Sequence, residues 1–253
     1  MNAIMTTGGR VDMRETAPAL PRLSVGEIHV WKASLDETPF RDDPGHLSLD
    51  EIERAARYRF PRDRSRFVAG RALLRELLGG YLGRRPSELA FEYGRHGKPR
   101  LAPSAGGPPL HFNVTHADSL ALYAVTMDGE VGIDMERIRE IPEWESIAGG
   151  CFTEHECVRL RRLSPDRRRR EFFQAWTRQE ALLKASGQGL TGAKAGDHSA
   201  RDSGYSLHAM TPAPGYLAAL ASRHPVCRVV FMTWSVAPAS TFSSTVETQG
   251  ILT

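Results

Sequence analysis

Each half of this sequence contains one long helical pattern with short strand patterns beside it. Apolar residues recur at helical spacing over about 63–82 and again over 165–186, and glycines end both patterns. Strand patterns bounded by turn residues surround each helix. We therefore expect an α+β fold of two similar lobes, joined near residues 130–140, each lobe a small, mostly antiparallel sheet packed on a long helix.

Shorter elements follow from local signals. Ser48, with Glu51 three residues later, predicts a helix that begins at a capping box. Asp128-Gly129 predicts a tight hairpin turn whose return strand is 131–136. Another helix is expected near 153–163, and strands are expected near 28–33, 89–93, 110–114, 120–126, 205–209 and 226–236.

These patterns divide the chain into four parts. Residues 1–24 are small, polar and interrupted by proline, and we expect a disordered lead-in. The N-terminal lobe is expected at 25–130 and the C-terminal lobe at 131–237, followed by a loose, Ser/Thr-rich tail at 238–253. The chain has no apolar run long enough to cross a bilayer and no secretory signal, which predicts a cytoplasmic protein with no membrane partner.

The cysteine and arginine patterns exclude only a few classes of function. Cys151, Cys157 and Cys227 are an odd set without a close pair, which argues against a disulfide framework. Cys151, His155 and Cys157 lie close together in the sequence but fit no familiar zinc-site spacing, so we expect ordinary thiols. The net charge is +3, and an arginine run over 161–170 is either a solvated face or a surface for an acidic partner or a polyphosphate.

Residues 132–136 (GIDME) form the sharpest local pattern. On a strand, Asp134 and Glu136 point to the same face while Ile133 and Met135 enter the core. Two adjacent carboxylates repel each other unless a cation neutralises them, and their hard oxygens suit Mg²⁺. The alternative is a solvated strand end with nearby arginines as counter-charges.

The long second helix places Trp176, Glu180 and Lys184 one turn apart on one side. A glutamate followed by a lysine at this spacing is most often simple helix support. The same geometry would also bring a third carboxylate and an ammonium group to a phosphate site. There, together with a metal ion, they would stabilise charge on a transferring phosphoryl group.

Residues 112–116 (FNVTH) end a strand in the hydroxyl of Thr115 and the imidazole of His116. Both groups can donate to phosphate oxygens, and a structural role is the alternative for the histidine. Lys98 is one of four lysines in the chain and lies on a tight Gly-Lys-Pro turn, where its charge could hold a phosphate. The chain has no nucleophile elbow, Walker A loop or dinucleotide-binding glycine pattern.

The order of these motifs resembles one enzyme family. G-K-P at 97–99, F-N-x-[ST]-H at 112–116, G-[IV]-D-x-E at 132–136 and W-x-x-x-E-A-x-x-K-x-x-G-x-G-L at 176–190 follow the pattern of the Sfp-like 4′-phosphopantetheinyl transferases. The resemblance covers about residues 47–190. It implies a pseudo-dimer of two α+β lobes in one chain, with coenzyme A bound in the cleft between them.

The resemblance also implies roles for individual residues. Asp134, Glu136 and Glu180 would hold Mg²⁺, with Mn²⁺ as a substitute, against the pyrophosphate of coenzyme A. The coenzyme A contacts would be Arg66, Lys98 and Thr115 at the 3′-phosphate, His116 at the pyrophosphate, Lys184 beside the leaving group, and Arg54 as a further basic position in the first helix. Glu180, or Glu156 in a matching F-x-x-x-E element, would be the general base.

The implied reaction moves the phosphopantetheine arm of coenzyme A to a serine of an apo acyl or peptidyl carrier protein and releases 3′,5′-ADP. The implied partners are carrier proteins of fatty-acid, polyketide or nonribosomal-peptide synthesis. A two-lobed chain can complete its site alone, so we expect a monomer, and we expect no nucleic-acid partner.

Two positions depart from the family pattern. Thr115 stands where the family usually has serine, which keeps the hydroxyl. Gln179 stands where the family usually has lysine before the helix glutamate, which removes a positive charge. The alternatives are therefore a coenzyme A-binding regulator that has lost catalysis and, from another class, a metal-dependent phosphodiesterase or nuclease. All three metal carboxylates are present, which favours an active enzyme.

Overall fold

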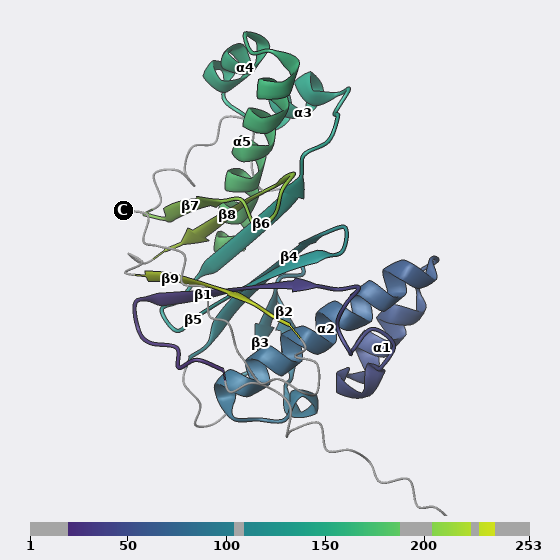
Figure 1. Cartoon of the computed structure of the whole chain (residues 1–253). Coiled ribbons are helices and arrows are strands. Elements are labelled where there is room, and N and C mark those ends of the chain that lie inside the picture. The colour runs from purple at the N-terminus through teal and green to yellow at the C-terminus, as the bar shows by residue number, and fades with distance from the viewer. Residues whose placement is uncertain (1–19, 104–108, 188–203, 224–227, 236–253) are drawn as a thin grey trace, which may run out of the picture.

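A computed structural model describes residues 20–103, 109–187, 204–223 and 228–235. These residues form four layers (Figure 1): helix α2 (Pro61–Leu82), a four-stranded sheet, a three-stranded sheet and helix α5 (Pro165–Ser186). The predicted α+β fold with a long helix against a small sheet in each lobe is confirmed. The expected tail at 238–253 and most of the expected lead-in lie outside the described residues.

The first sheet has the strand order β4-β5-β1-β9. Its members are β4 (His111–Ala117), β5 (Leu120–Thr126), β1 (Glu27–Ser34) and β9 (Arg228–Thr233). Strand β9 runs parallel to β1, while the other pairs are antiparallel. The expected C-terminal lobe at 131–237 is therefore corrected: its last strand returns to the first lobe. The buried strand β1 gains a backbone partner on its second edge in this way.

The second sheet has the order β6-β8-β7, from β6 (Val131–Arg137), β8 (Tyr216–Ser222) and β7 (Ser206–Met210). The prediction that 131–136 forms a hairpin with 120–126 is wrong. Strand β5 pairs with β4 and β1, whereas β6 pairs with β8. The turn at 128–129 therefore leads the chain from the first sheet to the second. The Asp128 carboxylate fixes this turn to the start of β1, where it accepts a hydrogen bond from Gly26 N–H at 2.6 Å.

The helices begin and end largely where the local signals place them. Helix α1 (Leu49–Ala56) starts at the predicted capping box, in which Ser48 N–H donates to Glu51 at 3.0 Å. Helix α5 ends at Gly187, whose φ of 70° suits glycine. The remaining elements are the helices α3 (Trp144–Cys151) and α4 (Glu154–Arg161), the short helical turns η2 (Pro44–His46) and η3 (Pro86–Glu88), and the hairpin strands β2 (Phe91–Tyr93) and β3 (Pro99–Leu101). Helix α3 was not predicted.

The apolar core follows the layers. One cluster fills the space between α2 and the first sheet, and a second, including Ile28, Leu122 and Ile133, lies between the two sheets. Two further clusters pack α5 against the second sheet and against α3 and α4. Among the described residues, no helix is both long and apolar enough to span a membrane.

A buried ion pair ties α1 to α2. Glu51 and Arg75 are 2% and 1% exposed, and Arg75 Nε donates to Glu51 at 2.7 Å. Arg75 also donates to the carbonyls of Pro86 and Leu89, which fixes the chain after α2. Burial would raise the pKa of Glu51, but the hydrogen bond from Arg75 and the charge of Arg71 outweigh it and lower the pKa.

Gly132 lets α5 lie directly on β6. A Cβ at this position would stand 2.1 Å from the carbonyl oxygen of Ala181 and 2.3 Å from the backbone nitrogen of Ala185. Both contacts are backbone atoms of α5, so a side chain could be accommodated only by moving the helix away from the strand.

We predict that Glu51→Gln destabilises the fold by about 3 kcal/mol, because it keeps the shape of the side chain but leaves a buried guanidinium without its counter-charge. Urea unfolding measures the change. The matched control is Glu53→Gln, on the exposed side of the same helix, which should change stability by less than about 0.5 kcal/mol. Equal effects of the two substitutions would contradict the ion-pair argument.

We predict that Gly132→Ala destabilises the protein by about 2 kcal/mol or more, because the added methyl overlaps the backbone of α5. Gly149→Ala is the control, since a Cβ at that helical glycine meets nothing within 4 Å and should stabilise α3 slightly. Thermal unfolding of both variants tests the contrast. A Gly132→Ala protein as stable as the Gly149→Ala protein would refute the close packing.

Candidate active site

Strands β4 and β6 meet at the edges of their sheets without a backbone ladder between them. Side chains from β4 take the place of a neighbouring strand. The Asn113 side-chain oxygen accepts from Ile133 N–H at 2.9 Å, and Thr115 Oγ1 accepts from Met135 N–H at 3.2 Å. Both side chains are 5% exposed. Buried backbone donors must be paired, so these two contacts close the open edge of β6.

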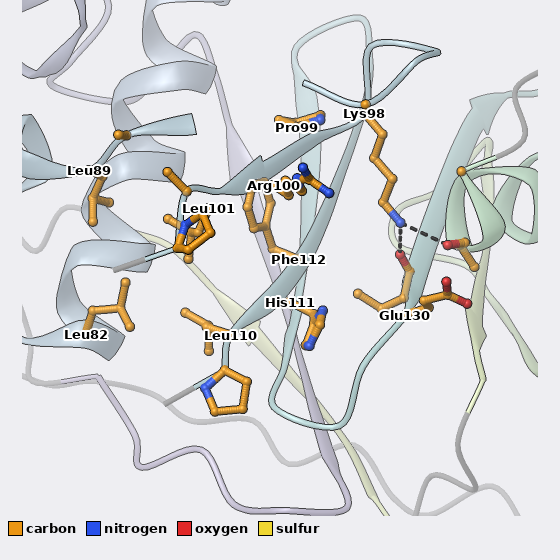
Figure 2. Close-up of a pocket in the computed structure, with 18 of the residues that line it drawn as sticks. Leu82, Leu89, Lys98, Pro99, Arg100, Leu101, Leu110, His111, Phe112 and Glu130 are labelled. Atoms are coloured by element: carbon orange, nitrogen blue, oxygen red, sulfur yellow. Dashed lines mark hydrogen bonds between the residues drawn. The ribbon is translucent and has the colours of Figure 1, made fainter. Parts of the chain in front are cut away.

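Lys98 completes the same edge from the β2–β3 hairpin. Its ammonium donates to the carbonyl oxygens of Val131 at 3.0 Å and Ala185 at 3.1 Å, as the dashed lines in Figure 2 show. Burial lowers the pKa of Lys98 to about 8, against the opposing charge of Glu130. We call Lys98, Asn113 and Thr115 the edge clamp, because all three reach from the first lobe to alternate residues of β6.

Asp134 lies at the centre of the site. Its side chain is buried, and one oxygen accepts from Lys184 Nζ at 2.6 Å and from the Thr115 hydroxyl at 3.4 Å. The other oxygen, Oδ2, is buried with no hydrogen-bond partner. A buried carboxylate oxygen without a partner is costly, and its cost falls when a cation or donor binds there.

Glu180 and Glu136 add two carboxylates to this centre. Burial first, and then the charges of Asp134 and Glu136, raise the pKa of Glu180 to about 6, although Lys184 opposes the shift. Glu136 is partly exposed and pairs with Arg139 at 3.1 Å. The other two predicted metal carboxylates therefore lie close enough to act on the charge of Glu180, which is an electrostatic condition that favours binding a cation.

The donor set fits Mg²⁺ in its chemistry. Three carboxylates converge, and Asp134 offers a buried oxygen without a partner. Within the described part of the chain, no three His, Cys, Asp or Glu side chains are already arranged around a metal position. In this conformation the ammonium of Lys184 neutralises Asp134.

His116 and Arg66 border the same centre. His116 is an exposed residue near the end of β4. The surrounding protein partly shields the imidazole from water, and this desolvation lowers its pKa. The positive charges of Lys184 and Arg66 lower it further. Arg66 makes a two-pronged ion pair with Asp36, at 2.9 and 2.6 Å, which lowers the pKa of Asp36.

Two predicted site residues have other partners. The guanidinium of Arg54 lies 5.4 Å from the centre of the Phe67 ring, on the side of α1 that packs against α2. Glu156 belongs to the capping box of α4, where it accepts from Thr153 N–H and Oγ1 at 3.0 Å each. This helix packs near the N-terminal end of α5, far from β6 in Figure 1.

Two residues inside the motifs have roles that the sequence interpretation missed. Asn113 closes the edge of β6, and Gly132 admits α5. An asparagine in the middle of a predicted strand was a usable signal, because this residue type is depleted in strands. Gln179, the departure from the family pattern, is partly buried, and its side-chain oxygen has no hydrogen-bond partner.

Comparison with known proteins places both lobes in one family. A family model for the 4′-phosphopantetheinyl transferase superfamily matches residues 130–211, and a model described as 4′-phosphopantetheinyl transferase, N-terminal, matches residues 30–128. The first model covers β6, α5 and β7 with the three carboxylates. The second covers most of β1 and all of β2 to β5, with the edge clamp.

Individual relatives agree with these models. The chain is 41% identical over 177 residues to the 4′-phosphopantetheinyl transferase HetI of Nostoc sp., covering 68% of this chain and 75% of that protein. It is 38% identical to the 4′-phosphopantetheinyl transferase AcpT of Escherichia coli K12, over 49% of this chain and 58% of that protein. It is 30% identical to the 4′-phosphopantetheinyl transferase gsp of Aneurinibacillus migulanus, over 62% of each. With family models that match both lobes and a relative that is 41% identical over 75% of its own length, the chain belongs to the 4′-phosphopantetheinyl transferase family.

Proposed function

We propose that this transferase moves the phosphopantetheine arm of coenzyme A to a carrier-protein serine at the centre formed by Asp134, Glu136, Glu180 and Lys184. The observation that carries the proposal is the unpartnered, buried oxygen of Asp134 beside two further carboxylates and one ammonium group. An anionic cluster of this kind needs a cation, and pyrophosphate with Mg²⁺ is the substrate combination that such a cluster accepts.

In this proposal Asp134, Glu136 and Glu180 hold Mg²⁺. When bound, the ion would neutralise the pyrophosphate oxygens of coenzyme A and orient them. The serine oxygen attacks the β-phosphorus, and the bond from that phosphorus to the oxygen bridging the α-phosphate breaks. The serine proton passes to a base, for which Glu180 is our candidate, and 3′,5′-ADP leaves with the electron pair of the broken bond.

In this proposal the basic side chains around the carboxylates bind the substrate. Lys184 exchanges its contact with Asp134 for one with the leaving group, and His116 donates to the pyrophosphate. Arg66 contributes a phosphate contact beside its ion pair with Asp36. Lys98 and Thr115 are left out of this set, because their polar atoms already bond to β6 and α5. Glu156 is also left out as a candidate base, because its carboxylate caps α4.

The inactive-regulator alternative rests on Gln179 alone. The convergence of the three carboxylates and Lys184 favours an active enzyme, because a regulator that only bound coenzyme A would not need a buried carboxylate without a partner. We further propose that the protein acts in the cytoplasm as a monomer on carrier proteins of fatty-acid, polyketide or nonribosomal-peptide synthesis.

The test is intact-mass analysis of apo carrier proteins incubated with the protein, coenzyme A and Mg²⁺. We predict a mass gain of one phosphopantetheine and a rate at least about 100-fold lower for Asp134→Asn, which keeps the shape but removes the charge. The control is Glu92→Gln, an exposed carboxylate on β2 that pairs with Arg100. Calorimetry with coenzyme A separates lost binding from lost chemistry. Unchanged transfer by Asp134→Asn would contradict the assigned centre.

A further inference from the structure

A groove of about 740 Å³ separates the β2–β3 hairpin from the second lobe, and Lys98 spans it. Figure 2 shows its side chain extending from the hairpin turn to the backbone of the other lobe. The apolar wall is formed by the first lobe, with Leu89, Leu101 and Phe112 among its residues. The contact of Lys98 is therefore made between lobes and across a gap.

The two acceptors of Lys98 belong to the two elements that carry the site. Val131 opens β6, three residues before Asp134. Ala185 lies in the last turn of α5, directly after Lys184. The last carbonyls of a helix lack partners within it, and a cation there also interacts favourably with the helix dipole. Lys98 thus caps α5 and closes β6 at the same time.

The local balance of charge supports a structural contact. Burial lowers the pKa of Lys98 to about 8, and Glu130 is the nearby charge that opposes this shift. Two carbonyl acceptors at 3.0 and 3.1 Å supply the hydrogen bonds that a buried ammonium requires. Most of the ammonium's capacity to donate is thereby used inside the protein.

We propose that Lys98 is a positioning residue that holds the end of α5 against the start of β6, rather than a ligand of the 3′-phosphate of coenzyme A. It acts through Lys184 and Asp134, whose 2.6 Å contact depends on the register of the same two elements. The expected effect on the turnover number rests on the proposed function. The expected effect on coenzyme A binding does not depend on it.

The experiment pairs Lys98→Met with two ligands, coenzyme A and 3′-dephospho-coenzyme A. The methionine keeps the stem and removes the donors. A positioning role predicts that the ratio of the two dissociation constants changes by less than twofold, while the turnover number of transfer falls at least tenfold with either ligand. Arg100→Met, which removes an exposed cation from the same hairpin, should leave both the ratio and the turnover number unchanged.

A phosphate contact predicts a different pattern. The protein would then lose its discrimination between the two ligands, with affinity for coenzyme A falling to that for the dephospho form. That result would overturn the proposal. An unchanged turnover number would do the same. If Lys98→Met does not fold, Lys98→Gln, whose amide retains two N–H donors, is read by the same ratio. Because calorimetry reads that ratio without a carrier protein, failure of transfer by the wild-type protein would count against the proposed function and not against this assignment.

Discussion

The open edge of β6 is the constraint on which the rest of the structure depends. This strand carries Asp134 and Glu136 and pairs with β8 on one side only. On the other side it faces another sheet, so its buried backbone groups need partners that no strand supplies. The edge clamp provides them at Val131, Ile133 and Met135. The carboxylates and Lys184 come from β6 and α5 of the second lobe. The contact between lobes adds Thr115 and His116 from β4 of the first lobe beside them.

The packing of α5 on β6 concentrates charge at the boundary between the lobes. Asp134 is buried at the boundary and Glu180 approaches it from α5, so the charge of Asp134 adds to burial in raising the pKa of Glu180. Lys184 offsets part of this cost through its 2.6 Å contact with Asp134. Gly132 makes the approach of α5 possible, since any side chain there would overlap the helix backbone. The close packing of α5 on β6 therefore also brings the charges of Asp134, Glu180 and Lys184 together.

Local sequence patterns predicted the helices and strands better than they predicted which of these elements lie side by side. The capping box at Ser48 and the span of α5 were confirmed because caps and helical periodicity are properties of adjacent residues. Strand β8 was missed because its sequence, YLAALAS, is buried almost throughout and does not alternate. The pairing of β9 with β1, and of β6 with β8, depends on contacts far apart in the chain. The motif also grouped Asn113 with Thr115 without revealing that both serve the backbone of β6.

Amide hydrogen exchange at Ile133 and Met135 tests the central claim most directly. If side chains of β4 close the edge of β6, both amides should exchange as slowly as those of the paired strand β5, and Asn113→Ala should accelerate Ile133 much more than Met135. Fast exchange of both amides in the wild-type protein would show that the edge is open. In that case the two lobes would not be joined by the contacts described, and the account of the site would fail.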